Sequence, residues 1–600
     1  MVHLRFHRRL ELAHLHHHAL DPVIFPAHLG DSLREPLEQL VVLRSHDAGY
    51  GLGQRPVVDG VGQRVGRPRR RQVDEELDVD SEGLRLLLFR GQDTVHTHYS
   101  QARDQNAIHN VNLPGGTQPP IEAEHGRGVM RRTKIVATVG PATSEPDALK
   151  ALLHAGVDVV RLNAAHGSPE VHAERAAIAR AAAASLGHTV GVLIDLPGPK
   201  LRTGPVAGDE VELRPDSRFV LTADAIEGDE HRVSTTVPEL ARWVRVGDEV
   251  FLADGAIVLH VENIDGDDVE CRVVRAGVLR SRKGMHVPRA EGHVDPFTDA
   301  DAIALEMAVR IKADFVGLSF VRRPEDVDAV RARLPKRGTK PHLIAKIETA
   351  VALDHLAGIV ASADSVMVAR GDLGIQIPAR RVPLIQKEII RFCNMAGKPV
   401  ITATQMLESM TRSPLPTRAE VNDVANAVLD GTDALMLSEE TAVGLYPTDT
   451  VRMMAEVAEA AEGWPSARTE PAGAAAANDD DRVAWAVAHA AVQAAEDLGV
   501  AAILCPTQSG TTARRVAAFR PGVPIVGISN QIDALGRLTL VWGVRPLSIR
   551  SADAERADLG EALGATRDAG IVHTGDLVAV VSASQGKRAG STDTVRVVRA

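Results

Sequence analysis

The chain has 600 residues, of which 44% are hydrophobic and only 3% aromatic, and its formal net charge is −11. This length predicts several domains, about four by the usual length per domain, and cores filled by Val, Ala, Leu and Ile suit parallel α/β layers. The negative charge argues against a nucleic-acid partner, and the absence of a long apolar run argues against a membrane span. Three separated cysteines without a CxxC pair indicate a reducing cytoplasm.

Residues 1–129 differ in composition from the rest of the chain. They hold 12 of the 24 histidines and no lysine, the first lysine being Lys134. No period of 2 or 3.6 runs through them, and neither a signal peptide nor a transit peptide fits their composition. We expect that this atypical leader is not a functional domain. It is either disordered or a translated upstream region, in which case the protein itself would start at Met130.

Short strands rich in β-branched residues alternate with helices from Lys134 onward. The first helix is expected over 144–155, with Ser144 as its N-cap and Gly156 just past its end. The eight expected strands are 134–140, 158–165, 191–196, 315–320, 342–348, 365–370, 399–404 and 434–438. This alternation predicts an α/β fold with a (β/α)₈ barrel built from residues 130–203 and 290–462.

Residues 204–289 interrupt the barrel pattern and alternate with period 2. Turn signals at 253–255 and 264–267 predict an inserted β-rich domain, which would act as a lid over the active site or form a passive insertion. Near its exit, Arg282-Lys283-Gly284 is basic and suited to reaching phosphate.

A linker over 463–482 precedes a C-terminal α/β domain, residues 483–600. In that domain the loop 507–512 lies between a strand end and a helix expected from Ala513. Its hydroxyls and glycine make either an anion site at a helix N-terminus or an ordinary helix cap.

Polar residues gather where the barrel strands end, and in such barrels the chemistry lies at the carboxyl ends of the strands. Glu348 and Asp372 each follow an apolar run, which places them at the same ends of successive strands. Two carboxylates with Lys346 nearby suit a hard divalent cation that meets a substrate phosphate; the alternative is a pair of solvated loop acids. The other polar residues at strand ends are Arg161, Asn163, Asp195, Ser319, Arg370, Thr404, Ser438 and Glu440.

A set of motifs from Thr133 to the C-terminus closely resembles the pyruvate kinases. The most specific segments are 133–141, 344–348, 367–374, 402–410 and 416–427. The resemblance implies transfer of a phosphoryl group from phosphoenolpyruvate to ADP, giving pyruvate and ATP in the last step of glycolysis. It also implies a catalytic barrel with a lid, a C-terminal regulatory domain and a homotetramer.

The resemblance implies roles for individual residues. Glu348 and Asp372 would hold Mg²⁺ or Mn²⁺, while Lys346 and Arg161 would stabilise the phosphoryl group. Thr404 would lie where the enolate is protonated. The remaining implied sites are the amides of Gly371 and Asp372 with the Thr404 hydroxyl for the substrate carboxylate, Asn163, His166, Arg202 and Lys283 for the nucleotide, and Thr507, Ser509, Gly510, Thr511 and Thr512 for the phosphate of a sugar-phosphate or nucleotide effector.

One departure from the family concerns potassium, which the family usually binds through Asn, Ser, Asp and Thr at two strand ends. Asn163 and Asp195 are present here, but Ala165 and Leu196 replace the two hydroxyl residues. Lys200 stands where potassium-requiring members carry Glu. Since an ammonium is a compact monovalent cation on a flexible stem, we predict that Lys200 replaces the ion and that potassium is not required.

Two other functions remain open from the sequence. A sensing paralogue would bind phosphoenolpyruvate or a sugar phosphate without turnover, which Ala165, Leu196 and the unusual Glu439 would permit. Another metal-dependent barrel enzyme acting on an enolate, such as an aldolase or lyase of a 2-oxo acid, would fit the carboxylate pair alone; the inserted and C-terminal domains argue against it. Gln376, where Glu is common, has no assigned role.

Overall fold

The computed structural model describes residues 131–289, 293–338, 340–464, 471, 478–550, 559–584 and 592–600, and the backbone of two short strands before them. These strands, β1 (Leu87–Gly91) and β2 (Thr94–His98), pair antiparallel within a unit that is separate from residues 123–600. No period in the sequence indicated a strand or helix there. The rest of the leader lies outside the described residues, so its expected character stays a prediction.

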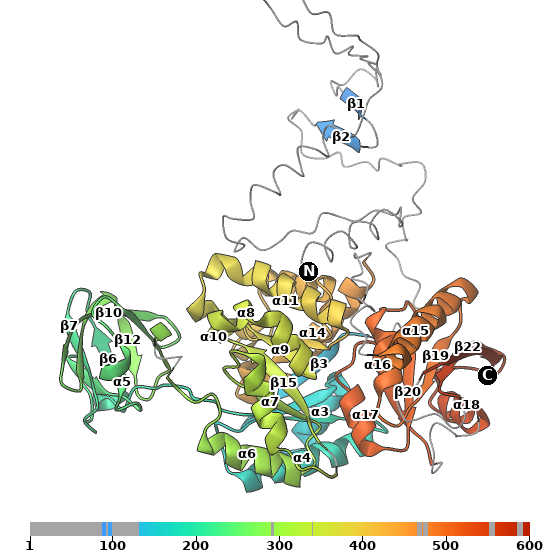
Figure 1. Ribbon diagram of the computed structural model, residues 1–600, viewed down its shortest axis with the longest axis horizontal. Coiled ribbons are helices and arrows are strands. Elements are labelled where there is room, and N and C mark those ends of the chain that lie inside the picture. The colour runs from blue at the N-terminus through green and yellow to red at the C-terminus, as the bar shows by residue number, and fades with distance from the viewer. Residues whose placement is uncertain are drawn as a thin grey trace, which may run out of the picture. The chain divides into compact units, whose positions relative to one another are not determined.

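Eight parallel strands close into a barrel in the order β14-β15-β16-β17-β18-β3-β4-β5. Two of these strands, β3 and β15, are labelled in Figure 1 among the helices of the barrel domain. Their bounds are β3 Lys134–Thr138, β4 Val159–Asn163, β5 Gly191–Asp195, β14 Phe315–Leu318, β15 His342–Ile347, β16 Ser365–Ala369, β17 Val400–Ala403 and β18 Ala434–Leu437. All eight expected strands are confirmed. Several end earlier than expected because the polar residues after the apolar run belong to the loops, as Glu348 does after β15.

Helices follow the barrel strands. They are α3 Pro146–Ala155, α4 Pro169–Ser185, α6 Asp299–Arg310, α7 Pro324–Arg333, α8 Ala350–Asp354, α9 Leu356–Ser362, α10 Arg370–Gln376, α11 Val382–Ala396, α12 Arg418–Leu429, α13 Glu439–Ala442 and α14 Pro447–Glu462, with short 3₁₀ turns at Ala379–Arg381 and Glu408–Thr411. The expected N-cap of the first helix was wrong: Glu145 occupies that position. Pro146 then forms the first helical turn, where its fixed φ and missing N–H are tolerated.

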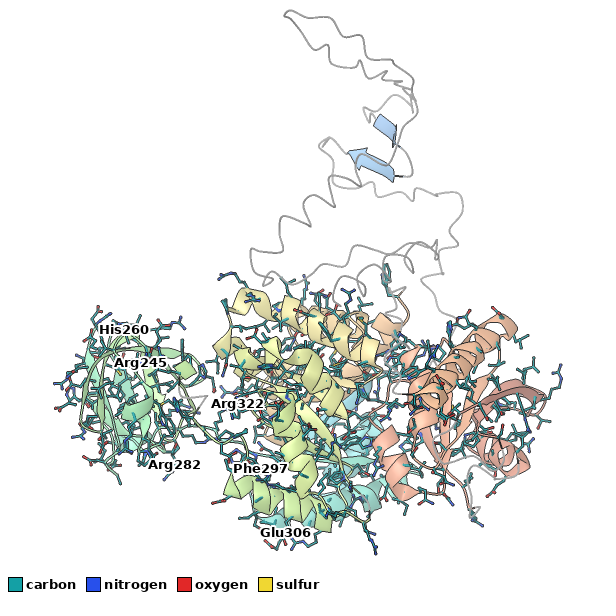
Figure 2. The ribbon with its side chains drawn as sticks, in the orientation of Figure 1. Arg245, His260, Arg282, Phe297, Glu306 and Arg322 are labelled. Atoms are coloured by element: carbon teal, nitrogen blue, oxygen red, sulfur yellow. The ribbon has the colours of Figure 1, made fainter. Side chains whose placement is uncertain are left out.

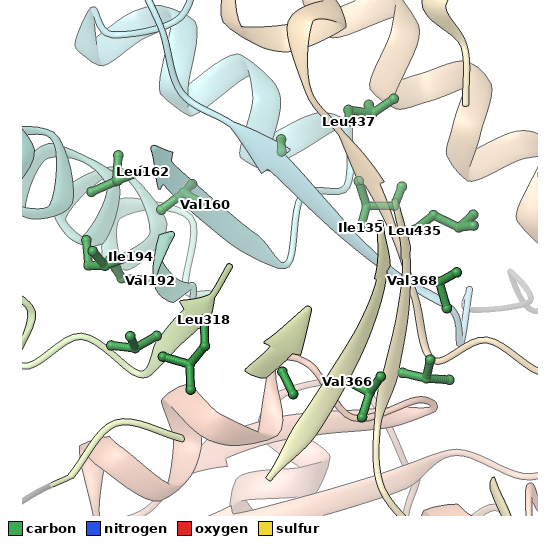
Figure 3. Packing of buried hydrophobic residues seen from close by; sticks show 14 of the residues in the cluster. Ile135, Val160, Leu162, Val192, Ile194, Leu318, Val366, Val368, Leu435 and Leu437 are labelled. Carbon is green, nitrogen blue, oxygen red and sulfur yellow. The ribbon is translucent and has the colours of Figure 1, made fainter. Parts of the chain in front are cut away.

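Alternate residues of each strand pack between the barrel and its helices. Val192 and Ile194, like Val366 and Val368, belong to this layer and are fully buried (Figure 3). The intervening residues form a second cluster that includes Val136, Phe315 and Met367. Leu540 of the C-terminal domain joins that cluster, so this domain contributes to the barrel core.

The insertion between β5 and β14 is β-rich, as expected, and has its own buried core around residues such as Phe219 and Leu252. A six-stranded sheet has the order β13-β9-β10-β11-β7-β8, and β12 pairs with β6. The turn at Ala253 and Asp254 has φ values of 50° and 54°, which confirms the expected reversal. The elements are β6 Glu210–Leu213, β7 Arg218–Thr222, β8 Arg232–Ser234, α5 Leu240–Trp243, β9 Glu249–Leu252, β10 Ile257–Asp265, β11 Asp268–Arg275, β12 Gly277–Arg280 and β13 Met285–His286, with a 3₁₀ turn at Ala207–Asp209.

The C-terminal domain is a five-stranded sheet of order β21-β20-β19-β22-β23 with helices, in which β23 alone runs antiparallel to its neighbour. Its elements are α15 Asp479–Leu498, β19 Ala502–Pro506, α16 Thr511–Ala518, β20 Ile525–Ser529, α17 Ile532–Leu538, β21 Val544–Ser548, α18 Leu559–Asp568, β22 Leu577–Ser582 and β23 Thr594–Arg599. The helix expected from Ala513 begins two residues earlier, at Thr511. Within the described residues, no helix is long and apolar enough to cross a membrane, and the three cysteines are buried free thiols.

Candidate active site

A buried ammonium group lies between two carboxylates at the carboxyl ends of the barrel strands. Lys346 Nζ is 2.9 Å from Glu348 Oε1 and 3.3 Å from Asp195 Oδ1, and it donates a hydrogen bond to Ser319 Oγ at 2.8 Å. Burial by itself lowers the pKa of Lys346, but Asp195 and Glu348 outweigh burial and hold the pKa above its ordinary value. Lys346 is therefore a fixed positive charge at neutral pH.

Asp195 also orients Arg161, a residue of β4. Arg161 Nε and Nη2 lie 2.7 Å and 2.6 Å from Asp195 Oδ2, and Nη1 donates to Thr138 Oγ1 at 2.9 Å. Burial raises the pKa of Asp195, but the charges of Lys346 and Arg161 lower it by more than burial raises it. The pKa therefore lies below its ordinary value, and the carboxyl stays ionised. One buried carboxylate thus holds both cations that the sequence analysis assigned to the phosphoryl group.

Glu348 and Asp372 form a pair of carboxylates whose negative charges repel each other. Glu348 is only 1% exposed, and its Oε2 accepts a hydrogen bond from the Phe320 amide at 2.7 Å. Burial raises the pKa of Glu348; Lys346 opposes this rise and Asp372 adds to it, so the pKa remains above its ordinary value. A divalent cation would relieve this repulsion, because it favours the ionised form of both groups.

These two oxygen donors fit Mg²⁺ or Mn²⁺. In the described part of the chain, no group of three or more His, Cys, Asp or Glu side chains is arranged to hold a metal ion. Mg²⁺ is usually held by one or two carboxylates and completes its shell with substrate phosphate and water. Glu348 and Asp372 are therefore the residues that would hold the cation.

Arg370 supports the turn that carries Thr404. Thr404 and Gln405 have φ values of 69° and 53°, a conformation that costs about 1–3 kcal/mol for a residue other than glycine. Arg370 Nη2 donates to the carbonyl oxygens of both residues, at 2.6 Å and 3.1 Å, while Nη1 pairs with Asp423 at 2.7 Å. The guanidinium thereby holds the strained turn in place.

The Thr404 hydroxyl lies against the first turn of α10. The Gly371 amide donates to Thr404 Oγ1 at 2.8 Å, and this hydroxyl donates to the Ala403 carbonyl at 2.6 Å. The structure thus brings together the amide and the hydroxyl that were expected to receive the substrate carboxylate. Here these two groups bind each other.

The four residues expected at the nucleotide fall into two pairs. Asn163 is the last residue of β4 and His166 lies in the loop after it, where Asn163 Oδ1 accepts from the Ala165 amide at 3.1 Å. Arg202 and Lys283 lie where the chain enters and leaves the insertion, and Arg202 Nη1 donates to the Arg282 carbonyl at 3.1 Å. Arg282 lies at the edge of the insertion where the chain returns to the barrel (Figure 2).

Lys200 lies in the loop after β5, the strand that ends with Asp195, but its side chain faces Asp372, which follows β16. Its Nζ lies 3.3 Å from Asp372 Oδ1, so it brings a positive charge to an expected metal ligand. A cleft adjoins this pair. The cleft is lined from the insertion by Phe251, Asp254, Gly255 and His286, and from the barrel by Phe320, Thr349, Ile375 and Gln376, among others.

Comparison with known proteins agrees with this architecture. Residues 130–451 match the family model of the pyruvate kinase barrel domain, and residues 485–598 match that of the pyruvate kinase alpha/beta domain. The chain belongs to the pyruvate kinase family. Curated relatives include pyruvate kinase 2 of Synechocystis sp., 41% identical over 471 residues that cover 78% of this chain and 79% of the relative. The pyruvate kinase of Bacillus licheniformis is 40% identical over 477 residues, covering 78% and 80%.

Membership in the pyruvate kinase family makes the chain a phosphotransferase, and it favours the first of the functions considered from the sequence. In the pyruvate kinase alpha/beta domain, the loop before α16 has the expected hydroxyl cluster. Ser509 Oγ lies 2.9 Å from Thr511 Oγ1, the Gly510 amide donates to Thr507 Oγ1 at 3.0 Å, and Thr512 Oγ1 lies 2.8 Å from Thr592 Oγ1. Gly510, with φ 84°, is the N-cap of the helix.

Three supporting residues of this pyruvate kinase site received no role from the sequence. Arg370 and Ser319 were recognised only as polar residues at strand ends, and Gln376 only as a departure from a common Glu. Gln376 Oε1 accepts from the Ala350 amide at 2.9 Å, and its Nε2 lies 3.3 Å from His286 Nδ1. Their partners lie far away in sequence, so no local pattern identified them.

Proposed function

We propose that this chain transfers the phosphoryl group of phosphoenolpyruvate to ADP, giving pyruvate and ATP, with Mg²⁺ or Mn²⁺ as its divalent cofactor. The observation that carries the proposal is the buried Lys346, held between Asp195 and Glu348. Arg161 adds a second fixed cation on the same carboxylate. Phosphoryl transfer depends almost entirely on positioning and electrostatic stabilisation, which such fixed charges supply.

In this reaction the bond from phosphorus to the enolate oxygen breaks, and a bond from phosphorus to a β-phosphate oxygen of ADP forms. Lys346 and Arg161 would stabilise the charge on the phosphoryl group during the transfer. Glu348 and Asp372 would hold the divalent cation, which would supply positive charge to the reacting oxygens when bound. The amides of Gly371 and Asp372 and the hydroxyl of Thr404 would bind the substrate carboxylate; Asn163, His166, Arg202 and Lys283 would bind the nucleotide.

The enolate released by the transfer must take up a proton at carbon to become pyruvate. Thr404 would stand beside this carbon and pass the proton through a water molecule. Arg370 supports this role by holding the strained Thr404 turn.

We further infer that turnover does not require potassium. Ala165 and Leu196 offer no side-chain oxygen at two positions where the family uses hydroxyls, and Lys200 places its amino group 3.3 Å from Asp372 Oδ1. The side chain of Lys200 would thus supply a positive charge in place of the ion, at Asp372 and not at the retained ligands Asn163 and Asp195.

We also infer that the α16 loop binds the phosphate of a sugar-phosphate or nucleotide effector. The loop places the hydroxyls of Ser509, Thr511 and Thr512 at a helix N-terminus, where amide groups and the helix dipole favour an anion. Titration of the purified enzyme with sugar phosphates and nucleotides at low phosphoenolpyruvate would test this, activation or inhibition being the expected result.

A coupled assay of pyruvate formation tests the main proposal, using the full chain with Mg²⁺, phosphoenolpyruvate and ADP in tetramethylammonium buffer with and without potassium. We expect comparable turnover in both buffers. Turnover only with potassium would refute the Lys200 inference alone. Silence in both buffers, also with sugar phosphates present, would refute the kinase proposal and favour a sensing role.

A further inference from the structure

Gln376 connects three elements that meet beside the candidate metal site. It is the last residue of α10, whose first turn carries Asp372. Its Oε1 accepts from the amide of Ala350, the first residue of α8, at 2.9 Å. Its Nε2 lies 3.3 Å from Nδ1 of His286, a residue of strand β13 in the insertion.

One of these elements, α10, carries the expected metal ligand Asp372, and another, α8, begins just after Glu348. Ala350 follows Glu348 by two residues, and Thr349 between them caps α8 by accepting from the Ala352 amide at 3.1 Å. A displacement of Gln376 would therefore act directly on the turn after Glu348 and on the helix that bears Asp372.

The third element belongs to the sheet of the insertion. In β13, His286 pairs with Phe251 of β9, and the two rings lie 5.7 Å apart. Gly255 of the insertion and Ile375 of α10 also line the same cleft. The insertion thus meets α10 through His286, and its β9 to β10 turn faces the cleft that α10 lines.

An amide suits this position better than a carboxylate does. It offers an acceptor to the Ala350 amide and a donor to the imidazole, whereas an ionised carboxylate only accepts. A Glu would also add a third negative charge close to Glu348 and Asp372, two carboxylates that already repel each other.

We propose that Gln376 is a positioning residue that couples the seating of the insertion to the placement of Glu348 and Asp372. This inference rests on the proposed function, because it assumes that those carboxylates act in phosphoryl transfer. Gln376 contacts neither substrate nor metal in this scheme; it acts through Ala350 and His286.

The test compares Gln376→Leu, which removes both hydrogen bonds at similar size, with His286→Phe, which keeps the ring and removes the partner in the insertion. For Gln376→Leu we expect kcat to fall roughly five- to thirtyfold, from one or two net hydrogen bonds lost, with a smaller change in KM. The double variant should lose no more than the worse single variant, because the two substitutions remove one shared interaction. Gln531→Leu, at an exposed position of the C-terminal domain, is the matched control and should leave kcat unchanged.

Hydrogen exchange supplies a readout that does not depend on turnover. In Gln376→Leu, the amide of Ala350 and the peptide spanning β13 should both exchange faster than in the wild type. In Gln376→Glu the acceptor for Ala350 persists, so the Ala350 amide should keep its protection. This variant also keeps the proposal testable if Gln376→Leu does not fold.

Wild-type kcat in Gln376→Leu, losses that multiply independently in the double variant, unchanged exchange at β13 in Gln376→Leu, or loss of protection at Ala350 in Gln376→Glu would overturn the proposal. If the wild-type chain itself makes no pyruvate, the proposed function fails. The exchange comparison would still decide whether Gln376 connects the insertion to the barrel.

Discussion

Replacing Lys346 with Met should remove the central charge of the site while keeping most of the apolar stem. In the wild type, the ammonium is 2.9 Å from Glu348 and 3.3 Å from Asp195. At an effective dielectric constant of about 20, unit charges at such separations attract by roughly 5–6 kcal/mol per pair, before the cost of burying them. After the substitution Arg161 is the cation still paired with Asp195, and Glu348 loses its ion pair.

Two consequences of Lys346→Met have different magnitudes. Removing one partner of a buried ion pair typically costs about 3–5 kcal/mol of unfolding free energy, because the remaining charge stays desolvated. Loss of a preorganised group that stabilises transition-state charge typically costs about 10²–10³-fold in kcat. Mg²⁺ should restore part of the stability, since it supplies positive charge to Glu348, but not the rate.

The assay combines pyruvate formation with urea unfolding at pH 7, in the presence and absence of Mg²⁺. Because the pKa of Lys346 lies above its ordinary value, its electrostatic contribution is complete at this pH and is lost only at strongly alkaline pH. Lys150→Met, on the exposed face of α3, is the matched control and should behave as the wild type. A Lys346→Met enzyme that keeps more than about a tenth of the wild-type kcat would refute the assignment of this charge to the transferring phosphoryl group.

Three further predictions concern other parts of the molecule. Lys200→Glu should make turnover depend on added potassium; a variant equally active in tetramethylammonium and potassium buffers would contradict the replacement of the ion by Lys200. Gly536→Ala should lower the unfolding free energy measured in denaturant titrations by about 1–3 kcal/mol, because the added Cβ would lie 1.8 Å from Asp314 Oδ1. Gly564→Ala, which has open space around it, is the control and should be neutral or slightly stabilising in the same titrations. Burial raises the pKa of Asp314 to about 6, so the folded state favours the protonated carboxyl, and the unfolding free energy should fall as pH rises from about 4 through about 6. Asp314→Asn should flatten this pH dependence in urea midpoints measured across the same range. An unchanged pH dependence in the variant would show that another group causes it.

The sequence predicted the barrel well because local patterns encode it. Strands such as 191–196 and 434–438 are short apolar runs followed by a polar residue, and the structure confirms both within a residue or two. The first helix shows the limit of such patterns: Ser144 satisfies the sequence rule for an N-cap, yet Pro146 fixes the helix start later. Competing local signals of this kind are resolved by backbone geometry.

By itself, the sequence determined which residues stand at the carboxyl ends of the barrel strands. Parallel strands of a closed barrel bring their carboxyl ends to one face, so Lys346, Glu348 and Asp372 had to meet there once their strands were recognised. Only the tertiary structure decided which charges pair across that face. Lys200 reaches Asp372 over 172 residues of sequence, and Gln376 reaches His286 over 90. Such pairings depend on how side chains from separate segments reach one another in the folded chain, which the period of a strand or helix does not encode.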